Sequence, residues 1–201
     1  MISPDYCVMM ARYNAWQNKQ MQAALQILPP DALTQERGAF FGSILKTVNH
    51  LLWGDRMWMA RFDRGAKPNG GVSDSVICTP TLAVWGSERF RTDGRILRWA
   101  EQVRSVDLVG DLRWYSGIKQ ADVTMPMGLC VAHMFNHQTH HRGQVHAMLT
   151  AAGGTGLGDG PVFDAAGRAA AVRGIVISAL LRMGEEKHNV QRIDRRQRRR
   201  G

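Results

Sequence analysis

Two histidines four residues apart, His137 and His141, stand in a segment whose apolar residues recur with helical spacing. Positions four apart lie on one face of a helix, with side chains about 5–6 Å apart. That face borders an apolar stripe, which consists of Met127, Cys130, Met134, Val145 and Met148. The segment therefore predicts a helix that turns both imidazoles, together with Gln144, toward a helical core, where both could bind one divalent metal ion.

A third ligand has to come from another part of the chain. Catalytic zinc and iron sites normally use three protein ligands and leave one position open. The best donor is His50, on a second segment with helical spacing. Its neighbours on the same stripe, Ser43, Thr47 and Gly54, are all small. Small neighbours leave room for an ion and for a further ligand.

The other histidines offer alternatives. Each of the three candidate ligands could instead be an ordinary core or surface histidine. A shared cation satisfies three buried rings at once, so we favour a metal site. His133 and His140 compete as ligands, and both lie about 40–60° round the helix from His137, away from its apolar side. We expect them beside the ligands or at the rim, with His133 as the reserve ligand. His146 projects from the opposite face and should be solvated.

These segments resemble the DinB/YfiT-like superfamily of metalloenzymes, which are four-helix bundles with a three-histidine metal site. The matching pieces are Tyr13-Asn14-Ala15-Trp16, residues 38–44, residues 49–58 and residues 133–144. Together they span roughly residues 6 to 153. The resemblance implies His50, His137 and His141 as the metal ligands and an all-α, DinB-like fold.

The remaining patterns predict how the chain is built. Helices are expected near residues 5–28, 38–62, 80–106 and 124–153, with a short hairpin at residues 112–117 and 122–125. Thr79, followed by Pro80, has the form of a helix N-cap, and Thr124 could cap the fourth helix. This order fits a four-helix bundle whose second and fourth helices bring their histidines together.

The last forty residues match no family feature. We divide the chain into a metal-binding bundle at residues 1–160, an accessory segment at 161–190 with a fifth helix near 165–183, and a disordered tail at 191–201. The tail holds six arginines and one aspartate, which is +5 of the net charge of +9. Because the body is only mildly basic, a solvated tail is favoured over a nucleic-acid-binding one.

Cysteine usage and hydropathy favour a cytoplasmic protein that does not enter the membrane. The three cysteines are odd in number, and none lies in a Cys-x-x-Cys arrangement, which is typical of a reducing compartment. The chain starts without a basic and apolar leader pattern. Near its C-terminus the longest charge-free run, residues 174–181, is far shorter than the ~20 residues of a membrane-spanning helix.

Several other motifs have two interpretations. Asp55 and Arg142 both project from the apolar sides of their helices, so we predict an ion pair between them; the alternative is that Asp55 orients a ligand histidine. Cys130 is by default a small buried hydrophobe, with a reactive thiol as the alternative. The glycine-rich run at residues 153–160 follows a helix instead of opening one, which indicates an exit loop and not a phosphate-binding loop.

Three neutral imidazoles would leave a bound Zn, Ni or Fe ion its full charge, which suits the activation of a water or a thiol. Relatives implied by the resemblance include thiol-dependent S-transferases and isomerases that use bacillithiol, mycothiol or glutathione. The first hypothesis is therefore a metal-dependent thiol S-transferase in stress response or detoxification, with Gln144 or His133 assisting catalysis. Its expected partners are a small-molecule substrate, such as a low-molecular-weight thiol, and, as one option, a second copy in a homodimer.

Two alternatives stay open beside the transferase. One is a metal-dependent hydrolase, which would use a water at the open position. The other is a non-enzymatic protein in which the ion only staples the second helix to the fourth. Coordination separates these classes, because a catalytic site keeps an exchangeable position and a structural site is closed by a fourth side chain.

Overall fold

The computed structural model describes residues 2–154, 156 and 157 of the 201-residue chain. Its elements, in chain order, are α1 (Pro4–Leu25), α2 (Pro30–Thr34), α3 (Ile44–Phe62), the 3-10 helix η1 (Val72–Ile77), α4 (Leu82–Gln102), the 3-10 helix η2 (Ser105–Leu108), β1 (Asp111–Ser116), β2 (Ala121–Pro126) and α5 (Met127–Ala151). The predicted domain end at residue 160, the accessory segment, its helix near 165–183 and the arginine-rich tail lie outside the described residues.

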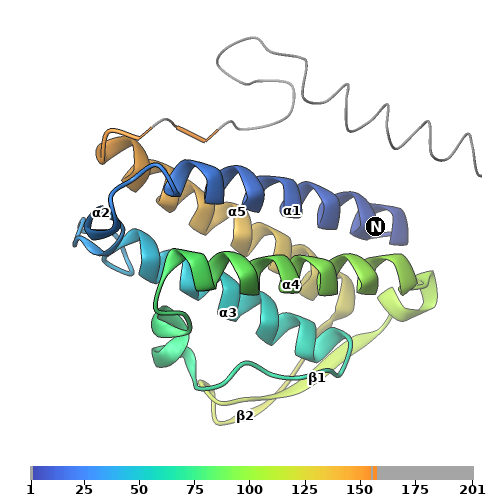
Figure 1. The fold of residues 1–201 in the computed structure, drawn as a ribbon. Coiled ribbons are helices and arrows are strands. Elements are labelled where there is room, and N and C mark those ends of the chain that lie inside the picture. Colours follow the sequence, from blue (N-terminus) through green and yellow to red (C-terminus); the bar gives the residue numbers. More distant parts are fainter. Residues whose placement is uncertain (1, 155, 158–201) are drawn as a thin grey trace, which may run out of the picture. The chain divides into compact units, whose positions relative to one another are not determined.

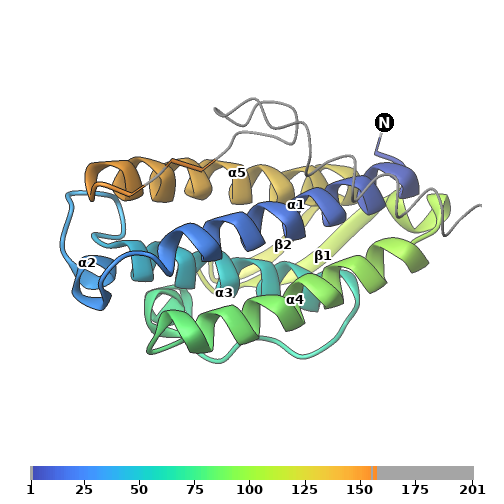
Figure 2. The same cartoon turned by 45° about the horizontal axis from the view of Figure 1, so that its top comes forward.

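Four long helices, α1, α3, α4 and α5, pack as a bundle, which confirms the predicted all-α class (Figures 1 and 2). α1 packs against α4 and α5, and α3 packs against the same two helices. Figure 1 shows α3 and α4 running in one direction and α1 and α5 in the other. Parallel neighbours such as α3 and α4 need a connection that returns along the bundle. Residues 63–81 make this return, and they place η1 against α3.

The helix starts differ from the predicted ones for local reasons. α3 begins at Ile44 and not at residue 38, because Gly38 and Gly42 adopt φ of 68° and 81°, which a right-handed helix cannot contain. Ser43 caps it by accepting a bond from the Lys46 amide. α4 is capped by Thr81. The predicted cap was wrong because the buried Thr79 hydroxyl donates to Asn49 on α3 instead.

The predicted hairpin is present, with β1 and β2 paired antiparallel. Its second strand includes Thr124, opposite Arg113, so the prediction that Thr124 caps the last helix was wrong. α5 follows directly at Met127 and ends at Ala151. Gly153, with φ of 78°, follows the last residues of α5 and ends this helix, as the sequence predicted. None of the described helices is long and apolar enough to cross a membrane.

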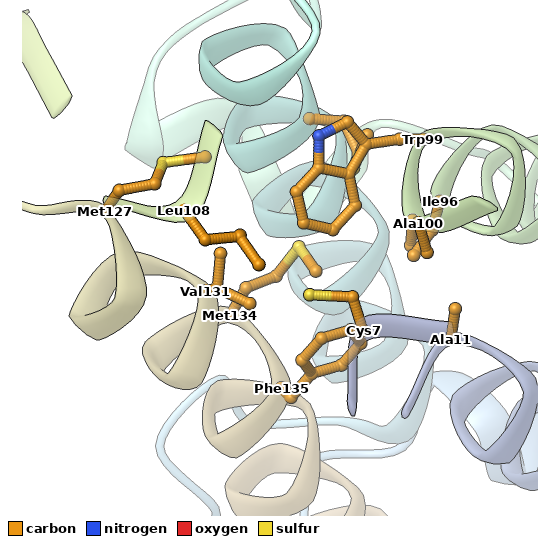
Figure 3. Close-up of a cluster of buried hydrophobic side chains, with 11 residues drawn as sticks. Cys7, Ala11, Ile96, Trp99, Ala100, Leu108, Met127, Val131, Met134 and Phe135 are labelled. Atoms are coloured by element: carbon orange, nitrogen blue, oxygen red, sulfur yellow. The ribbon is translucent and has the colours of Figure 1, made fainter. Parts of the chain in front are cut away.

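Two apolar clusters fill the bundle, one toward each end. The first, shown in Figure 3, packs Trp99 of α4 and Phe135 of α5 with Cys7 of α1. The second gathers residues such as Met21, Trp85 and Leu149 from the opposite halves of the helices. Between the two clusters, each long helix contributes buried polar residues, such as Asn14 of α1, Asp55 of α3, Arg89 of α4 and Gln138 of α5. The core is therefore divided by a polar layer at mid-height.

This polar layer links all four long helices and consists of Asn14, Asn18, Asp55, Arg89, Asp93, Gln138 and Arg142. Asp55 accepts from Arg89 at 2.6 Å and also from the Gln138 amide. Gln138 in turn accepts from Arg142 at 3.0 Å. The predicted Asp55–Arg142 ion pair is therefore wrong, because Gln138 lies between the two charges and Arg89 is the ion-pair partner of Asp55.

Candidate metal centre

The structure brings His50 of α3 together with His137 and His141 of α5. One ring nitrogen from each residue lies within 4.8 Å of the other two. The Nε2 atoms of His50 and His137 are 3.1 Å apart. Two metal–nitrogen bonds of 2.0–2.1 Å at a tetrahedral angle would place their nitrogens about 3.3–3.4 Å apart. The three side chains thus form a group that could bind a metal ion.

Hydrogen bonds at the outer nitrogens fix the orientation of two of these rings. The Ser75 hydroxyl donates to the Val72 carbonyl at 2.6 Å, so its oxygen is left to accept from Nδ1–H of His50, at 2.9 Å. In the same way the side-chain oxygen of Gln144 accepts from Nδ1–H of His141 at 2.9 Å. Both Nε2 atoms therefore carry lone pairs, which is the tautomer that a metal ligand needs.

His137 differs from the other two histidines because its outer ring nitrogen makes no such hydrogen bond within the described part of the chain. Its Nδ1 is buried and has no hydrogen-bond partner among the residues that the structure describes. A Cβ at Gly54 would approach its Cε1 to 3.0 Å, so the glycine is what admits this ring. His137 can donate at most one proton to the two lone pairs beside it, whereas a divalent cation would accept electron pairs from all three rings. The donor set therefore fits a metal ion better than it fits mutual hydrogen bonding.

Aromatic side chains surround the three histidines. The ring centroid of Phe41 lies 4.1 Å from that of His50 and 5.3 Å from that of His141. Trp53 stacks on His50 from its own helix, at 6.3 Å. Within residues 2–154, 156 and 157, no fourth histidine, cysteine or carboxylate joins the group. A metal ion held there would keep a position that no histidine, cysteine or carboxylate of the described residues fills.

Burial keeps the three imidazoles neutral at physiological pH. It lowers the pKa of His50 to about 4, with a further contribution from His141. It lowers the pKa of His137 to about 3, and the neighbouring histidines act in the same direction. The pKa of His141 is also lowered by burial. Since a histidine binds a metal only as the neutral ring, little proton competition is expected at pH 7.

We predict that the metal-free protein loses stability as the pH falls from about 6.5 toward 4. Unfolded histidines titrate near pH 6.5, and a lowered folded-state pKa means that protons bind preferentially to the unfolded chain. The stabilising contribution is therefore complete above pH 6.5 and is lost on acidification. The measurement is the urea midpoint at pH 7.5 and pH 5, compared with that of His137→Gln, which should lose less. Burial raises the pKa of Asp55 to about 6, an opposite effect that cancels in this comparison. Equal losses in both proteins would contradict the prediction.

The other histidines lie beside the group. His133 is exposed, and its ring centroid is 5.9 Å from that of His137. His140 is exposed and accepts a 3.3 Å bond from the Gln144 amide. Both therefore lie where the sequence placed them, next to the three converging rings. His146 is half-buried and accepts from the Leu157 backbone amide at 3.0 Å, so the prediction that it is solvated was wrong.

Cys130 has its default role as a small buried residue. The side chain is 1% exposed, and burial raises the pKa of the thiol. A raised pKa keeps the sulfur protonated at neutral pH, which disfavours the alternative of a reactive thiol.

Sequence reasoning did not identify Ser75 or Phe41. Ser75 reaches His50 because η1 crosses α3 on the return connection, and no helical periodicity marks that segment. Phe41 lies in the turn before α3, where the sequence predicted helix. The sequence does contain a sign of this turn. Phe40 and Phe41 lie between two glycines, a composition more typical of a turn than of a helix.

Comparisons with a family model, a known protein and a solved structure all find similarity to DinB proteins. The sequence model of the DinB family matches residues 1–165. Protein DinB of Bacillus subtilis (strain 168) is 26% identical over 154 residues, which cover 74% of this chain and 87% of that protein. The crystal structure of a DinB-like protein from Bacillus cereus ATCC 10987 is similar in fold, with a TM-score of 0.58 and 17% identity, over 77% of this chain and 95% of the other.

Proposed function

The chain belongs to the DinB family, and on that premise we propose that it is a metal-dependent enzyme acting on a small molecule. Within this class we propose a thiol S-transferase, in which His50, His137 and His141 hold a zinc, nickel or iron ion. The single observation that carries the proposal is the convergence of three neutral imidazoles with no fourth ligand among the described residues.

An open position favours an enzyme over a structural staple. Structural zinc sites are closed by four protein ligands, whereas catalytic sites use three and reserve the fourth position. Bound there, a divalent ion would supply the positive charge that keeps a thiol or a water deprotonated near neutral pH. The three free cysteines of the chain fit the reducing cytoplasm, which we propose as its compartment.

The chain's own residues would orient the site and move the proton. Ser75 and Gln144 hold His50 and His141 in the tautomer with Nε2 free. Phe41 covers the two rings and excludes water from that side. His133, exposed and adjacent to His137, has a pKa lowered by burial, so its neutral ring can accept the proton that a thiol loses on binding.

We predict that the metal-loaded protein, and not the metal-free protein, consumes a low-molecular-weight thiol in the presence of a generic electrophile. The rate should exceed the uncatalysed rate at least tenfold, because the thiol is presented as its nucleophilic form. The measurement follows free thiol with glutathione, bacillithiol and mycothiol in turn. His137→Ala serves as the metal-free control in the same buffer. No turnover with any of the three thiols would contradict the transferase and make hydrolysis by an activated water the leading chemistry.

A further inference from the structure

The guanidinium of Arg61 lies over the rings of two tryptophans. Its guanidinium carbon is 4.5 Å from the ring centroid of Trp58 on α3 and 4.8 Å from that of Trp114 on β1. The two indoles are themselves in edge contact at 5.8 Å. Contact with two aromatic rings restricts the orientations that the guanidinium can adopt.

The same guanidinium has no hydrogen-bond or ion-pair partner among the residues that the structure describes. A cavity of about 450 Å³ at this end of the bundle is lined by Arg61 and by three aspartates. Two of them are already paired, Asp63 with Arg95 and Asp107 with Arg104. The third, Asp111, is exposed and forms no ion pair with Arg61. Burial accordingly lowers the pKa of Arg61, and no carboxylate opposes the shift.

Burying part of a guanidinium without an acceptor for its N–H groups costs folding free energy. Packing alone is therefore a poor explanation for Arg61. An arginine has five N–H donors, and contacts with ring faces satisfy none of them in the way that an oxygen acceptor would. The buried Arg89, by comparison, forms an ion pair with Asp55. This structural arginine of the bundle therefore has a carboxylate partner, which Arg61 lacks among the described residues. A rigid cation with free donors is a typical feature of an anion-binding site.

A continuous wall of rings joins Arg61 to the histidine centre. The ring centroids of His137 and His133 lie 5.9 Å apart, and those of His133 and Trp58 lie 5.1 Å apart. Trp58 then contacts Arg61. Each of these side chains is at least partly exposed. These contacts place the guanidinium at the end of a row of rings that begins at the histidine centre.

We propose that Arg61 binds a carboxylate of the thiol substrate while the sulfur of that substrate lies at the three-histidine centre. Trp58, Trp114 and His133 would line the path between these two ends. The position of the sulfur rests on the proposed function, whereas the carboxylate site rests on Arg61 and its surroundings alone.

The spacing along α3 sets the size of the substrate. His50 and Arg61 are eleven residues apart, which places them on the same helical face and about 16 Å apart along the axis. The arginine side chain leans toward the N-terminus of its helix, so the remaining gap is on the order of 10 Å. In glutathione, the extended path from the sulfur of the central cysteine to the free carboxylate of the γ-glutamyl residue has about this length. Glutathione, a tripeptide-sized thiol with carboxylates, is therefore the appropriate probe.

The test measures binding by isothermal titration calorimetry with wild-type protein, Arg61→Met, Arg61→Lys and Arg113→Gln. Arg61→Met should weaken glutathione binding at least tenfold, because a charge-assisted bond is lost. Arg61→Lys should recover only part of the affinity, since an ammonium lacks the planar pair of donors. Arg113 is exposed on β1, next to Trp114, so Arg113→Gln removes an equal charge and should leave the affinity unchanged.

A second readout separates a binding role from a structural one. Methionine can pack against the two indoles without an unpaired charge, so the melting temperature of Arg61→Met should be unchanged or higher. On the ligand side, glutathione diethyl ester and 2-mercaptoethanol have no free carboxylate, so their affinities should be the same for wild-type protein and Arg61→Met. Unchanged glutathione affinity in Arg61→Met, or an equal loss in Arg113→Gln, would overturn the proposal. A lower melting temperature with unchanged affinity would also overturn it.

S-methylglutathione distinguishes this proposal from the proposed enzymatic reaction, because it has the carboxylates but no free thiol. Its affinity should depend on Arg61 in both the metal-loaded and the metal-free protein. If that dependence is found while no thiol is consumed by the metal-loaded protein, the carboxylate site stands and the thiol chemistry is wrong. If thiol is consumed and S-methylglutathione binds equally to wild-type protein and Arg61→Met, the carboxylate site is wrong and the chemistry stands.

Discussion

Replacing Asp55 by alanine should lower the free energy of unfolding by about 3–5 kcal/mol. The carboxylate is fully buried and accepts from both Arg89 and Gln138, so its removal leaves the Gln138 amide without its acceptor and the buried Arg89 guanidinium with Asp93 as its remaining ion-pair partner. Urea unfolding at pH 7.5 measures the loss, with helical circular dichroism as the signal.

Two control variants separate burial from charge. Glu101→Ala removes a carboxylate from an exposed pair with Arg12, 3.6 Å away, and should change stability by less than about 1 kcal/mol. The double variant Asp55→Leu, Arg89→Met should recover much of the loss, because apolar residues can replace a buried ion pair. An Asp55→Ala protein as stable as Glu101→Ala would show that the polar layer contributes nothing to stability.

Replacing His137 by alanine should abolish binding of a divalent metal, and replacing His50 or His141 should do the same. Each substitution removes one of the three rings that converge, and two imidazoles alone make a weak site. Ser75→Ala removes only the acceptor that orients His50 and should weaken binding about 10–100-fold. The measurement is competition with a chromophoric chelator in protein purified without a metal-affinity column.

The neighbouring histidines provide matched controls for that series. His133→Ala and His140→Ala remove imidazoles of the same helix that lie outside the group, so both variants should keep full affinity. Full metal occupancy in His137→Ala and His141→Ala would show that the ion, if any, binds elsewhere.

The sequence predicted the histidine group well because its geometry is local. His137 and His141 are one turn apart on α5, and the apolar stripe beside them determines which way they face. His50 could be added because its small neighbours leave room for an ion and a ligand, and one of them, Gly54, does lie against His137. The helices and the hairpin followed from the same kind of short-range pattern.

The parts that sequence reasoning missed depend on long-range pairing. Gln138 intervenes between Asp55 and Arg142, a relation between two helices that no spacing within either helix reveals. Arg89 is buried on α4 with Asp93 one turn away, and this polar pair within an apolar face was the available signal. Thr79 looks like a cap in sequence, but its bond to Asn49 on α3 decides its role.

The central claim is that His50, His137 and His141 hold one metal ion and leave a position open, and X-ray absorption at the metal edge tests it most directly. Zinc-loaded wild-type protein should give three imidazole nitrogens at about 2.0–2.1 Å and one exchangeable light atom. Adding glutathione should replace that atom by a sulfur at about 2.3 Å. A spectrum with four protein ligands and no change on adding thiol would contradict an open catalytic site, and fewer than three imidazoles would contradict the site itself.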